Sequence, residues 1–297
     1  MPGTGYLQAG EANITYLVPS GIWHPVSGIW NLVSCIQHRI KHSNRAHLMT
    51  TARHERRFYR NLVRTAELVS FRVAVKETDL CIHAEKDLAN TARELVFQQR
   101  GYLETYIQQH PAFAGALKPW RCTGPVPHII GDMVQAGQSA GVGPMAAVAG
   151  AIAQRVGKAL LRHSQEVVVE NGGDVFLATQ HSVVVGLYAG SSPLSLQVGV
   201  KVGGSNRPIS ICTSSATVGH SLSMGNADAV SVVSGNCALA DAAATSIGNR
   251  IHTQSDIQKA IAYGRQIDGV KGLVIILDDQ IALWGDLELV PLQVKKG

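Results

Sequence analysis

After Gln165 the chain becomes a succession of short, β-branched segments separated by Gly, Asn or Ser turns, and few folds accommodate that pattern. Runs of this length and composition are typical of β-strands. We predict strands at Glu166–Val169, Val175–Ala178, Val183–Tyr188, Leu196–Val202, Ile209–Cys212 and Ala229–Val233. Because strands that follow one another through short turns pair antiparallel, this region predicts a mainly antiparallel sheet.

Segments with helical spacing lie on both sides of the strand-rich region. Residues 86–108 repeat apolar residues at helical intervals with a break at Gly101, and the Ala-rich Met145–Leu161 is apolar almost all round, which predicts a buried helix. Further helices are predicted at Ala238–Ile247 and Ser255–Tyr263, and further strands at Phe71–Val75, Leu80–His83, Leu273–Leu277 and Ile281–Trp284. The sequence therefore predicts an α+β fold, with a mainly antiparallel sheet covered by helices.

Composition narrows the class of protein and its compartment. The 45 % share of hydrophobic residues separates the chain from disordered proteins. Gly, Pro or a charge interrupts every apolar run well before the roughly 20 residues that cross a bilayer, so we expect no membrane span. The five cysteines are scattered, without a C-x-x-C pair. We therefore expect a cytoplasmic protein with neither a disulfide framework nor a cysteine zinc site.

The N-terminal segment differs from the rest of the chain. Residues 1–48 show no amphipathic period, and we expect them to be a poorly ordered or wrongly assigned extension, with residues 49–297 forming one domain. Positive charge also gathers at this end, since residues 1–64 hold eight Lys or Arg against Glu11 and Glu55. The basic character is therefore local, and we expect no nucleic-acid partner.

Two motifs could bring a ligand and a cation together. The turn Glu170-Asn171-Gly172-Gly173-Asp174 lies between two predicted strands, and its glycines would let the backbone approach a ligand that Asn171 or Asp174 binds. The alternative is a plain hairpin turn. Asp241 and Thr245 are four residues apart, so they share one helix face and offer hard oxygen ligands that suit Mg²⁺ beside a phosphate. The alternative is that both serve their own helix, for which Asn236 is a plausible N-cap.

Two further segments are rich in groups that bind phosphate. In the segment Ile211–Ser221, five hydroxyl groups, including those of Thr213 and Ser214, and the imidazole of His220 follow a predicted strand. The alternative is a solvated loop. Gly141 and Gly143 precede the Ala-rich helix, where free backbone N–H groups can hold an anion. Close helix packing would explain the same glycines.

The order of these motifs resembles the ApbE-type FAD:protein FMN transferases, and more closely an ApbE-related prokaryotic family of largely unassigned function. The resemblance covers about Arg56 to Val290. It rests on Glu77–Leu80, Ala140–Ala153, Glu170–Asp174, Tyr188–Leu194, Ile211–Ser223 and Asp241–Asn249. It implies an ApbE-like α+β fold and a site for a flavin nucleotide or a similar phosphate-bearing molecule.

Residue by residue, the resemblance implies a metal site more firmly than catalysis. Asp241 and Thr245 match the family's metal-binding A-D-x-x-A-T motif, Gly172–Asp174 match its G-G-D turn, and Thr213-Ser214 match the start of its T-S-G loop.

Other family positions are changed in this chain. Ser215 and Ala216 replace the Gly and Asp that follow in the T-S-G loop, and Ala149-Gly150 replaces a Lys-Gly. Only His220, the candidate catalytic residue, remains of H-x-I-D-P-x-T-G.

The resemblance thus implies a FAD- or FMN-binding protein with a Mg²⁺-dependent phosphate site. It leaves open whether the protein is a weak FMN transferase with an acceptor protein, an FAD pyrophosphatase or a pure binder. The related family also suggests an alternative, an accessory protein in sulfide assimilation and homocysteine formation. In that case Cys212 and Cys81 are the thiols of interest, because a sulfur carrier needs an activated thiolate.

Overall fold

The computed structural model describes residues 16–17, 68–204, 207–216 and 224–292. The strands are β1 (Tyr16–Leu17), β2 (Val69–Val75), β3 (Thr78–Ala84), β4 (Val167–Asn171), β5 (Asp174–Ala178), β6 (Ser182–Gly186), β7 (Val198–Gly203), β8 (Ile209–Ser214), β9 (Ala229–Ser234), β10 (Val270–Leu277), β11 (Gln280–Gly285) and β12 (Glu288–Pro291). The helices are α2 (Ala89–Gln109), α3 (Ala112–Gly115), α4 (His128–Ala140), α5 (Val148–Leu160), α6 (Cys237–Gly248) and α7 (Ile257–Gly264), with short 3-10 turns η2 (Pro144–Ala147) and η3 (Gln254–Asp256).

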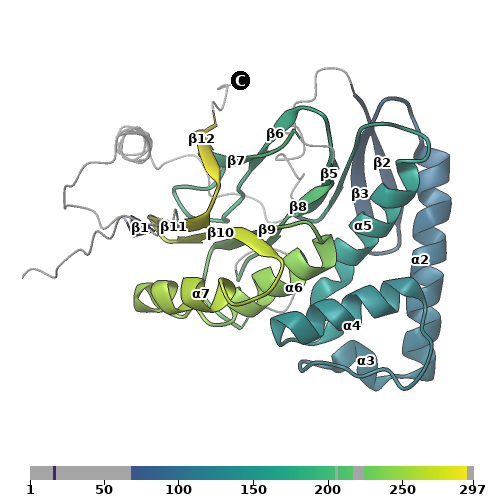
Figure 1. Cartoon of the computed structure of the whole chain (residues 1–297), viewed down its shortest axis with the longest axis horizontal. Helices are drawn as coiled ribbons and strands as arrows, with labels where there is room; N and C mark the ends of the chain where they lie inside the picture. Colours follow the sequence, from purple (N-terminus) through teal and green to yellow (C-terminus); the bar gives the residue numbers. More distant parts are fainter. Residues whose placement is uncertain (1–15, 18–67, 205–206, 217–223, 293–297) are drawn as a thin grey trace, which may run out of the picture.

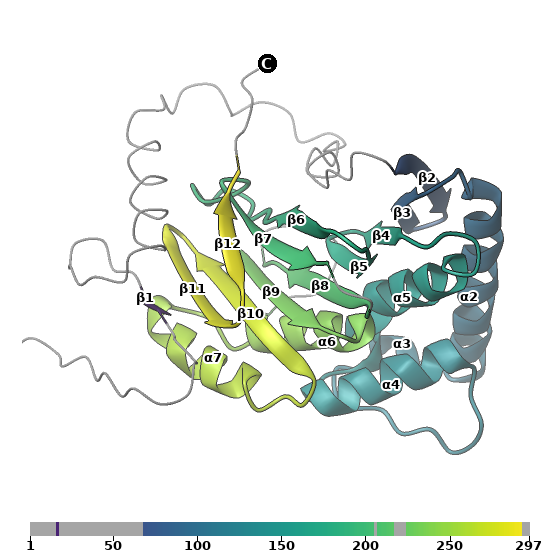
Figure 2. The same cartoon turned by 45° about the horizontal axis from the view of Figure 1, so that its top comes forward.

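Two antiparallel sheets and a layer of helices build the fold (Figures 1 and 2). The large sheet has nine strands in the order β1-β11-β10-β9-β8-β5-β4-β3-β2, and the small sheet has the order β12-β7-β6. The helices cover one face of the large sheet, and the small sheet packs on part of the other. The predicted α+β fold, a mainly antiparallel sheet covered by helices, is confirmed, whereas the second sheet was not predicted.

The central strands of the large sheet are apolar on both faces because the helices cover one face and the small sheet covers that part of the other. In β9, Val230 and Val232 join the core under the helices, while Ala229 and Val233 join the core between the two sheets. Each fully buried Val or Leu contributes roughly 1.5–3 kcal/mol. Helix α5 comes especially close to the sheet at Gly157, where a side chain would lie 2.3 Å from the Phe176 ring.

Helix α2 runs through Gly101 without interruption, so the predicted break there is wrong. A Cβ added at Gly101 would meet nothing within 4 Å, which places this glycine at an open surface. Glycine in a helix interior costs only about 0.5–1 kcal/mol relative to alanine. The apolar face of α2 outweighs that cost, since Ala92, Val96 and Leu103 are buried against the sheet side of the molecule.

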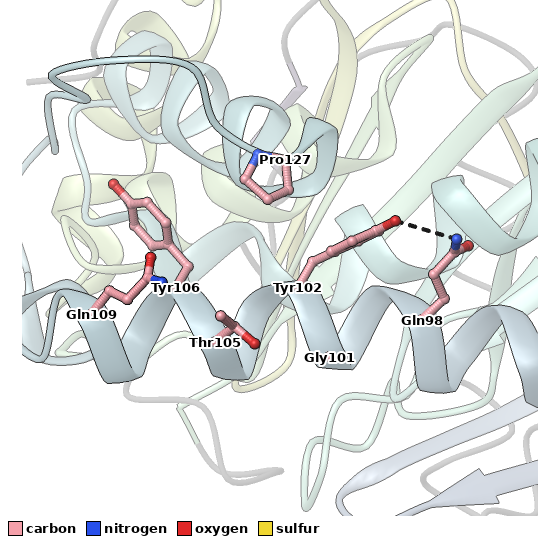
Figure 3. A pocket seen from close by; sticks show the side chains of 7 residues that line it. All are labelled: Gln98, Gly101, Tyr102, Thr105, Tyr106, Gln109 and Pro127. Atoms are coloured by element: carbon pink, nitrogen blue, oxygen red, sulfur yellow. Dashed lines mark hydrogen bonds between the residues drawn. The ribbon is translucent and has the colours of Figure 1, made fainter.

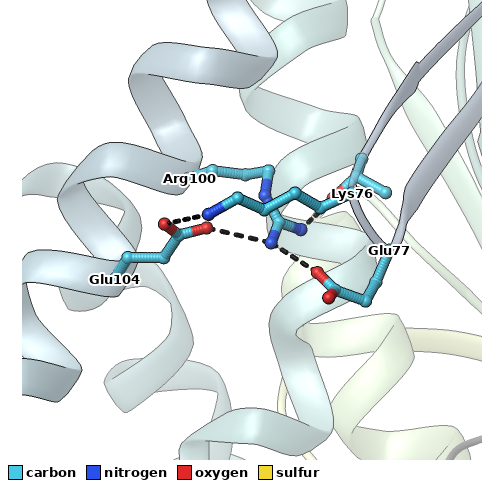
Figure 4. A network of polar contacts seen from close by, with 5 residues as sticks. Lys76, Glu77, Arg100 and Glu104 are labelled. Carbon is cyan, nitrogen blue, oxygen red and sulfur yellow. Dashed lines mark hydrogen bonds and ion pairs between the residues drawn. The ribbon is translucent and has the colours of Figure 1, made fainter.

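A polar network fastens α2 to the β2–β3 hairpin (Figure 4). Arg100 donates to Thr78 Oγ1 at 2.9 Å and to Glu104 Oε1 at 2.9 Å, and it also binds Glu77. The Arg100 side chain is only 14 % exposed, whereas that of Lys76, which binds Glu104, is 57 % exposed. Arg100 is therefore the member of this network whose loss removes the donor of a buried group, the Thr78 hydroxyl.

Replacing Arg100 by alanine should lower the free energy of unfolding by about 1–2 kcal/mol, because the buried Thr78 hydroxyl loses its donor. Lys76→Ala is the matched control on the same carboxylate, and it should cost less than about 0.5 kcal/mol. Urea unfolding of the two variants measures the difference. Equal losses would show that burial does not set the strength of this network.

No helix in the described ranges is long and apolar enough to cross a membrane. The expectation for residues 1–48 lies outside the described residues apart from Tyr16–Leu17, whose backbone pairs antiparallel with Ala282 and Leu283 of β11. The division at residue 49 stays a prediction.

Candidate functional site

The turn between β4 and β5 directs polar side chains toward the helices. Gly172 and Gly173 have φ values of +68° and +109°, in the left-handed region that favours glycine, so the segment makes a tight hairpin. Asn171, just before the turn, donates from Nδ2 to the carbonyl oxygen of Ala149 in α5 at 3.0 Å. Asp174, just after it, pairs with Cys212 across to β8 and is buried. The turn thus delivers Asn171 and Asp174 to the space between the large sheet and α5.

Helix α6 brings Asp241 and Thr245 to the same region. Asn236 caps this helix as predicted, because its side chain accepts from Leu239 N at 3.1 Å. The carboxylate of Asp241 does not serve its own first turn. It accepts hydrogen bonds from the backbone N–H groups of Gly150, at 2.8 Å, and of Ala149. Asp241 is therefore the acceptor at the positive end of α5, 91 residues away in sequence from Gly150.

Gly150 permits this contact because it has no side chain. A Cβ at this position would lie 2.4 Å from the carbonyl oxygen of Cys237 and 2.9 Å from Cβ of Asp241. Such distances are not reached by real Cβ atoms, so any other residue would push α5 and α6 apart. The Ala149-Gly150 pair thus fixes how closely the two helices approach at the candidate site.

Asp174 and Asp241 form a pair of carboxyl groups in an apolar setting. Burial raises the pKa of Asp174 well above its usual value, and the charge of Asp241 raises it further. Burial also raises the pKa of Asp241 to about 7, although the hydrogen bonds from Gly150 and Ala149 work in the opposite direction. Oδ1 of Asp174 is buried without a hydrogen-bond partner among the residues the structure describes. A cation bound between the two groups would stabilise their ionised forms, and Oδ1 of Asp174 is available as one of its ligands.

Two thiols lie directly beside this acid pair. Sγ of Cys212 is 3.5 Å from Sγ of Cys237 and 3.4 Å from the carbonyl oxygen of Cys237. Both side chains are completely buried. Burial raises the pKa of the Cys212 thiol well above its usual value, and the neighbouring Cys237, Asp174 and Asp241 add to the shift. Cys212 is thus a protonated packing residue and lacks the activated thiolate that the sulfur-carrier alternative would need.

The hydroxyl-rich segment divides between the two faces of the large sheet. Ser214 is buried at the end of β8, and its neighbour Thr213 pairs with Ser231, with 2.8 Å between their hydroxyl oxygens. Because side chains alternate along a strand, Thr213 lies on the face opposite to Cys212 and therefore away from Asp241. His220 falls outside the described residues, and its predicted catalytic role stays a prediction.

Gly141 and Gly143 have local structural roles. Gly141, with φ of +71°, ends α4 in the left-handed conformation. Gly143 packs so closely that a Cβ would lie 1.6 Å from the carbonyl oxygen of Ala116. The first turn of α5, where an anion was expected, instead binds the Asp241 carboxylate. Close packing therefore accounts for Gly143 and helix termination for Gly141, and their part in ligand binding stays a prediction.

Two surface cavities lie apart from these residues. One, of about 380 Å³, lies along α2 (Figure 3) and is lined by Gln98, Gly101, Tyr102, Thr105, Tyr106, Gln109 and Pro127. The other, of about 580 Å³, is lined by Asn226, His252, Thr253, Gln254, Ser255, Leu277 and Asp278. Neither is lined by a predicted site residue. Within the described ranges, no three or more His, Cys, Asp and Glu residues are grouped to hold a metal ion, so a cation at Asp241 would need hydroxyl, backbone or ligand oxygens as well.

The raised pKa of Asp241 makes stability depend on pH. Between pH 4 and 7 the folded state keeps a proton that the unfolded state has released, so rising pH lowers the free energy of unfolding through this group. An asparagine side chain does not ionise, so Asp241→Asn removes this contribution to the pH dependence of stability. In EDTA, the melting temperature of Asp241→Asn relative to the unaltered protein should therefore rise between pH 5 and pH 8. A relative melting temperature that does not change with pH would show that Asp241 titrates normally.

These features define the class of protein as a three-layer α+β protein with an acid pair, Asp174 buried and Asp241 partly buried, beside a Gly-Gly hairpin. The family described as AbpE bacteria matches residues 60–283, and the chain belongs to that family. This confirms the predicted relation to an ApbE-related family. The chain is 36 % identical over 234 residues to a UPF0280 protein of Methanococcus aeolicus, covering 77 % of this chain and 93 % of that protein. It is also 38 % identical over 214 residues to a UPF0280 protein of Methanocella arvoryzae, and the match covers 72 % of this chain and 87 % of that protein.

Solved structures of flavin transferases have a similar arrangement at low sequence identity. The apo form of the flavinyl transferase ApbE of Pseudomonas stutzeri is 12 % identical, with a TM-score of 0.47, and the similarity covers 76 % of this chain and 94 % of that one. The flavin transferase ApbE of Vibrio cholerae is 13 % identical, with a TM-score of 0.42, and the similarity covers 76 % of this chain and 97 % of that one.

Proposed function

We propose that the protein binds a flavin nucleotide, FAD or FMN, through a Mg²⁺-dependent phosphate site where the β4–β5 turn meets α6. The observation that carries the proposal is the acid pair, in which Asp174 and Asp241 both resist ionisation and Oδ1 of Asp174 lacks a partner among the described residues. Two carboxylates and the Thr245 hydroxyl are hard oxygen ligands of the kind that Mg²⁺ prefers. The donor set therefore fits this cation.

The β4–β5 turn lacks side chains where a phosphate would approach Asp174. Gly172 and Gly173 present bare backbone beside Asp174, so a phosphate oxygen could come close without meeting a side chain. Bound Mg²⁺ would supply charge neutralisation for the phosphate and for the acid pair. The chain itself would hold Asp241 in place through the N–H groups of Ala149 and Gly150, and hold the turn through the Asn171 amide.

Binding is better supported than rapid transfer. The chain differs from the transferases at positions that would align and stabilise the transferred group. Ala149 replaces a Lys there, and Ala216 replaces an Asp. Losing such electrostatic groups typically costs a few kcal/mol of transition-state stabilisation. We therefore propose a nucleotide binder that transfers FMN, or cleaves FAD, slowly.

Mass spectrometry of acceptor peptides tests this ranking. The full chain is incubated with FAD, Mg²⁺ and a peptide that carries an ApbE-type acceptor threonine, and the same reaction is analysed for free FMN. We expect bound FAD with little or no flavinylated peptide. Rapid, stoichiometric flavinylation would place the protein among the active transferases, and the absence of nucleotide binding would remove the flavin proposal altogether.

A further inference from the structure

A second chemical grouping lies on the opposite face of the large sheet from Asp241. Leu80 and Ile82 of β3 point into the core beneath the helices, so Cys81 and His83 point to the other face. Sγ of Cys81 is 3.8 Å from Nε2 of His83, two residues along the same strand. The Ser70 hydroxyl is 4.0 Å from the same sulfur. This is the arrangement in which an imidazole can take the proton of a thiol.

The imidazole is in the right protonation state for that role. Burial lowers the pKa of His83, so the ring is neutral near pH 7 and can accept a proton. His83 is 8 % exposed and Cys81 is 9 % exposed, so each residue keeps a small solvent-exposed area. Cys212 and Cys237, by contrast, are completely buried.

Within the part of the chain that the structure describes, the charges that face Cys81 come from both neighbouring strands. Arg72 of β2 and Glu170 of β4 lie directly across from it, and Asp79 of β3 binds Arg72 through Nε at 2.7 Å. The hydrogen bond and charge of Asp79 raise the pKa of Arg72, and the charge of Cys81 adds a smaller contribution. That coupling is mutual, so Arg72 stabilises a Cys81 thiolate, whereas the carboxylate of Glu170 on the other neighbouring strand opposes it. Among the described residues, two acidic groups lie beside one Arg at this patch, and this excess of negative charge disfavours anionic reagents.

We propose that Cys81 is a modification site, a thiol activated by His83 for attack on small, neutral electrophiles, with hydroperoxides as the natural class. The thiol proton passes to Nε2 of His83, and the thiolate attacks the terminal oxygen of the hydroperoxide. An S–O bond forms as the O–O bond breaks, and the departing alkoxide takes the proton from the imidazolium. The sulfur is oxidised by two electrons to a sulfenic acid, and the peroxide is reduced to an alcohol, or to water when the reagent is hydrogen peroxide.

Cys122 provides an internal comparison. It is more exposed than Cys81, but its sulfur contacts the hydroxyl of Tyr106 at 3.8 Å in place of an imidazole. Accessibility alone would make Cys122 the faster thiol, whereas activation by His83 makes Cys81 the faster one. Which of the two cysteines reacts faster therefore distinguishes activation by His83 from simple accessibility.

Iodoacetamide alkylation of the full chain, followed residue by residue by peptide mass spectrometry at pH 7, tests the proposal. We expect Cys81 to react at least about five-fold faster than Cys122, and His83→Gln to slow Cys81 about ten-fold without changing Cys122. His181→Gln, which alters a histidine whose side chain is 89 % exposed, is the matched control and should change neither rate. An equal or faster Cys122, or a Cys81 rate that His83→Gln leaves unchanged, overturns the proposal.

Labelling of the buried Cys212 or Cys237 would reveal that His83→Gln fails to fold. In that case the pH dependence of alkylation in the unaltered protein provides the test. The alkylation rate of Cys81 should level off at lower pH than that of Cys122, because its thiolate forms earlier. Identical pH profiles contradict the proposal. Brief treatment with hydrogen peroxide and a sulfenic-acid trap should then label Cys81 first, and trapping at Cys122 first contradicts the proposed chemistry.

Discussion

Gly150→Ala should lower the melting temperature by roughly 6–12 °C, a large effect for the addition of one methyl group. The new Cβ would lie 2.4 Å from the Cys237 carbonyl oxygen and 2.9 Å from Asp241 Cβ, so α5 and α6 must move apart. Overpacking of this kind costs about 1–3 kcal/mol, occasionally more, and each kcal/mol lowers the melting temperature by about 2–4 °C in a domain of this size. We expect a value near 3 kcal/mol because the contacted carbonyl belongs to the backbone and cannot rotate away.

Gly101→Ala is the control for this prediction. It makes the same chemical change inside a helix, but a Cβ there would meet nothing within 4 Å. Alanine is the better helix former by about 0.5–1 kcal/mol, so this variant should be slightly more stable than the unaltered protein. Differential scanning calorimetry of both variants measures the contrast. Similar melting temperatures for the two would contradict the close approach of α5 to α6.

Asp241→Asn should weaken Mg²⁺-dependent nucleotide binding about 100-fold or more. Loss of a residue that merely supports a metal ligand typically costs 10–100-fold in affinity, and Asp241 is proposed to be the ligand itself. The asparagine side chain can still accept the bonds from Gly150 and Ala149 through its oxygen, so the helix contact should survive. Asp279→Asn, in the exposed turn between β10 and β11, is the matched control and should bind as the unaltered protein does.

Fluorescence titration with FAD in Mg²⁺ compares the two variants. If Asp241→Asn binds as tightly as the control, then Asp241 is a structural cap of α5 and the metal site is elsewhere. If both variants lose binding together, a general loss of charge and not a specific ligand is responsible.

Local patterns in the sequence were sufficient for most of the fold. The β-branched runs around Val230 and Val232 predicted strands, and Asn236 predicted the start of α6, because strand propensity and helix capping depend on neighbouring residues. Gly101 misled because tertiary packing outweighed a small local cost. Strand β12 was missed since it is only four residues long and gains its partner from β7, far away in sequence.

The candidate site was harder to predict because its contacts are long-range. The motif spacing placed Asp241 and Thr245 on one face of α6, and the Gly-Gly turn was placed correctly between two strands. The sequence could not show that Asp241 accepts from Gly150, or that Asp174 lies beside it. The separation of Thr213 from Asp241 depends on which face of β8 Thr213 occupies relative to the face that α6 covers. Alternation along β8 was the one signal that could have revealed it.

Isothermal titration calorimetry of the full-length protein with FAD, first in Mg²⁺ and then in EDTA, addresses the proposed site itself. We predict saturable binding in Mg²⁺, with a 1:1 stoichiometry and net proton release near pH 7, since binding ionises an Asp241 whose pKa is about 7. In EDTA the affinity should fall by at least about ten-fold, or 1.4 kcal/mol. Binding of equal affinity in the two buffers, without proton release, would contradict a Mg²⁺ site at the Asp174–Asp241 pair.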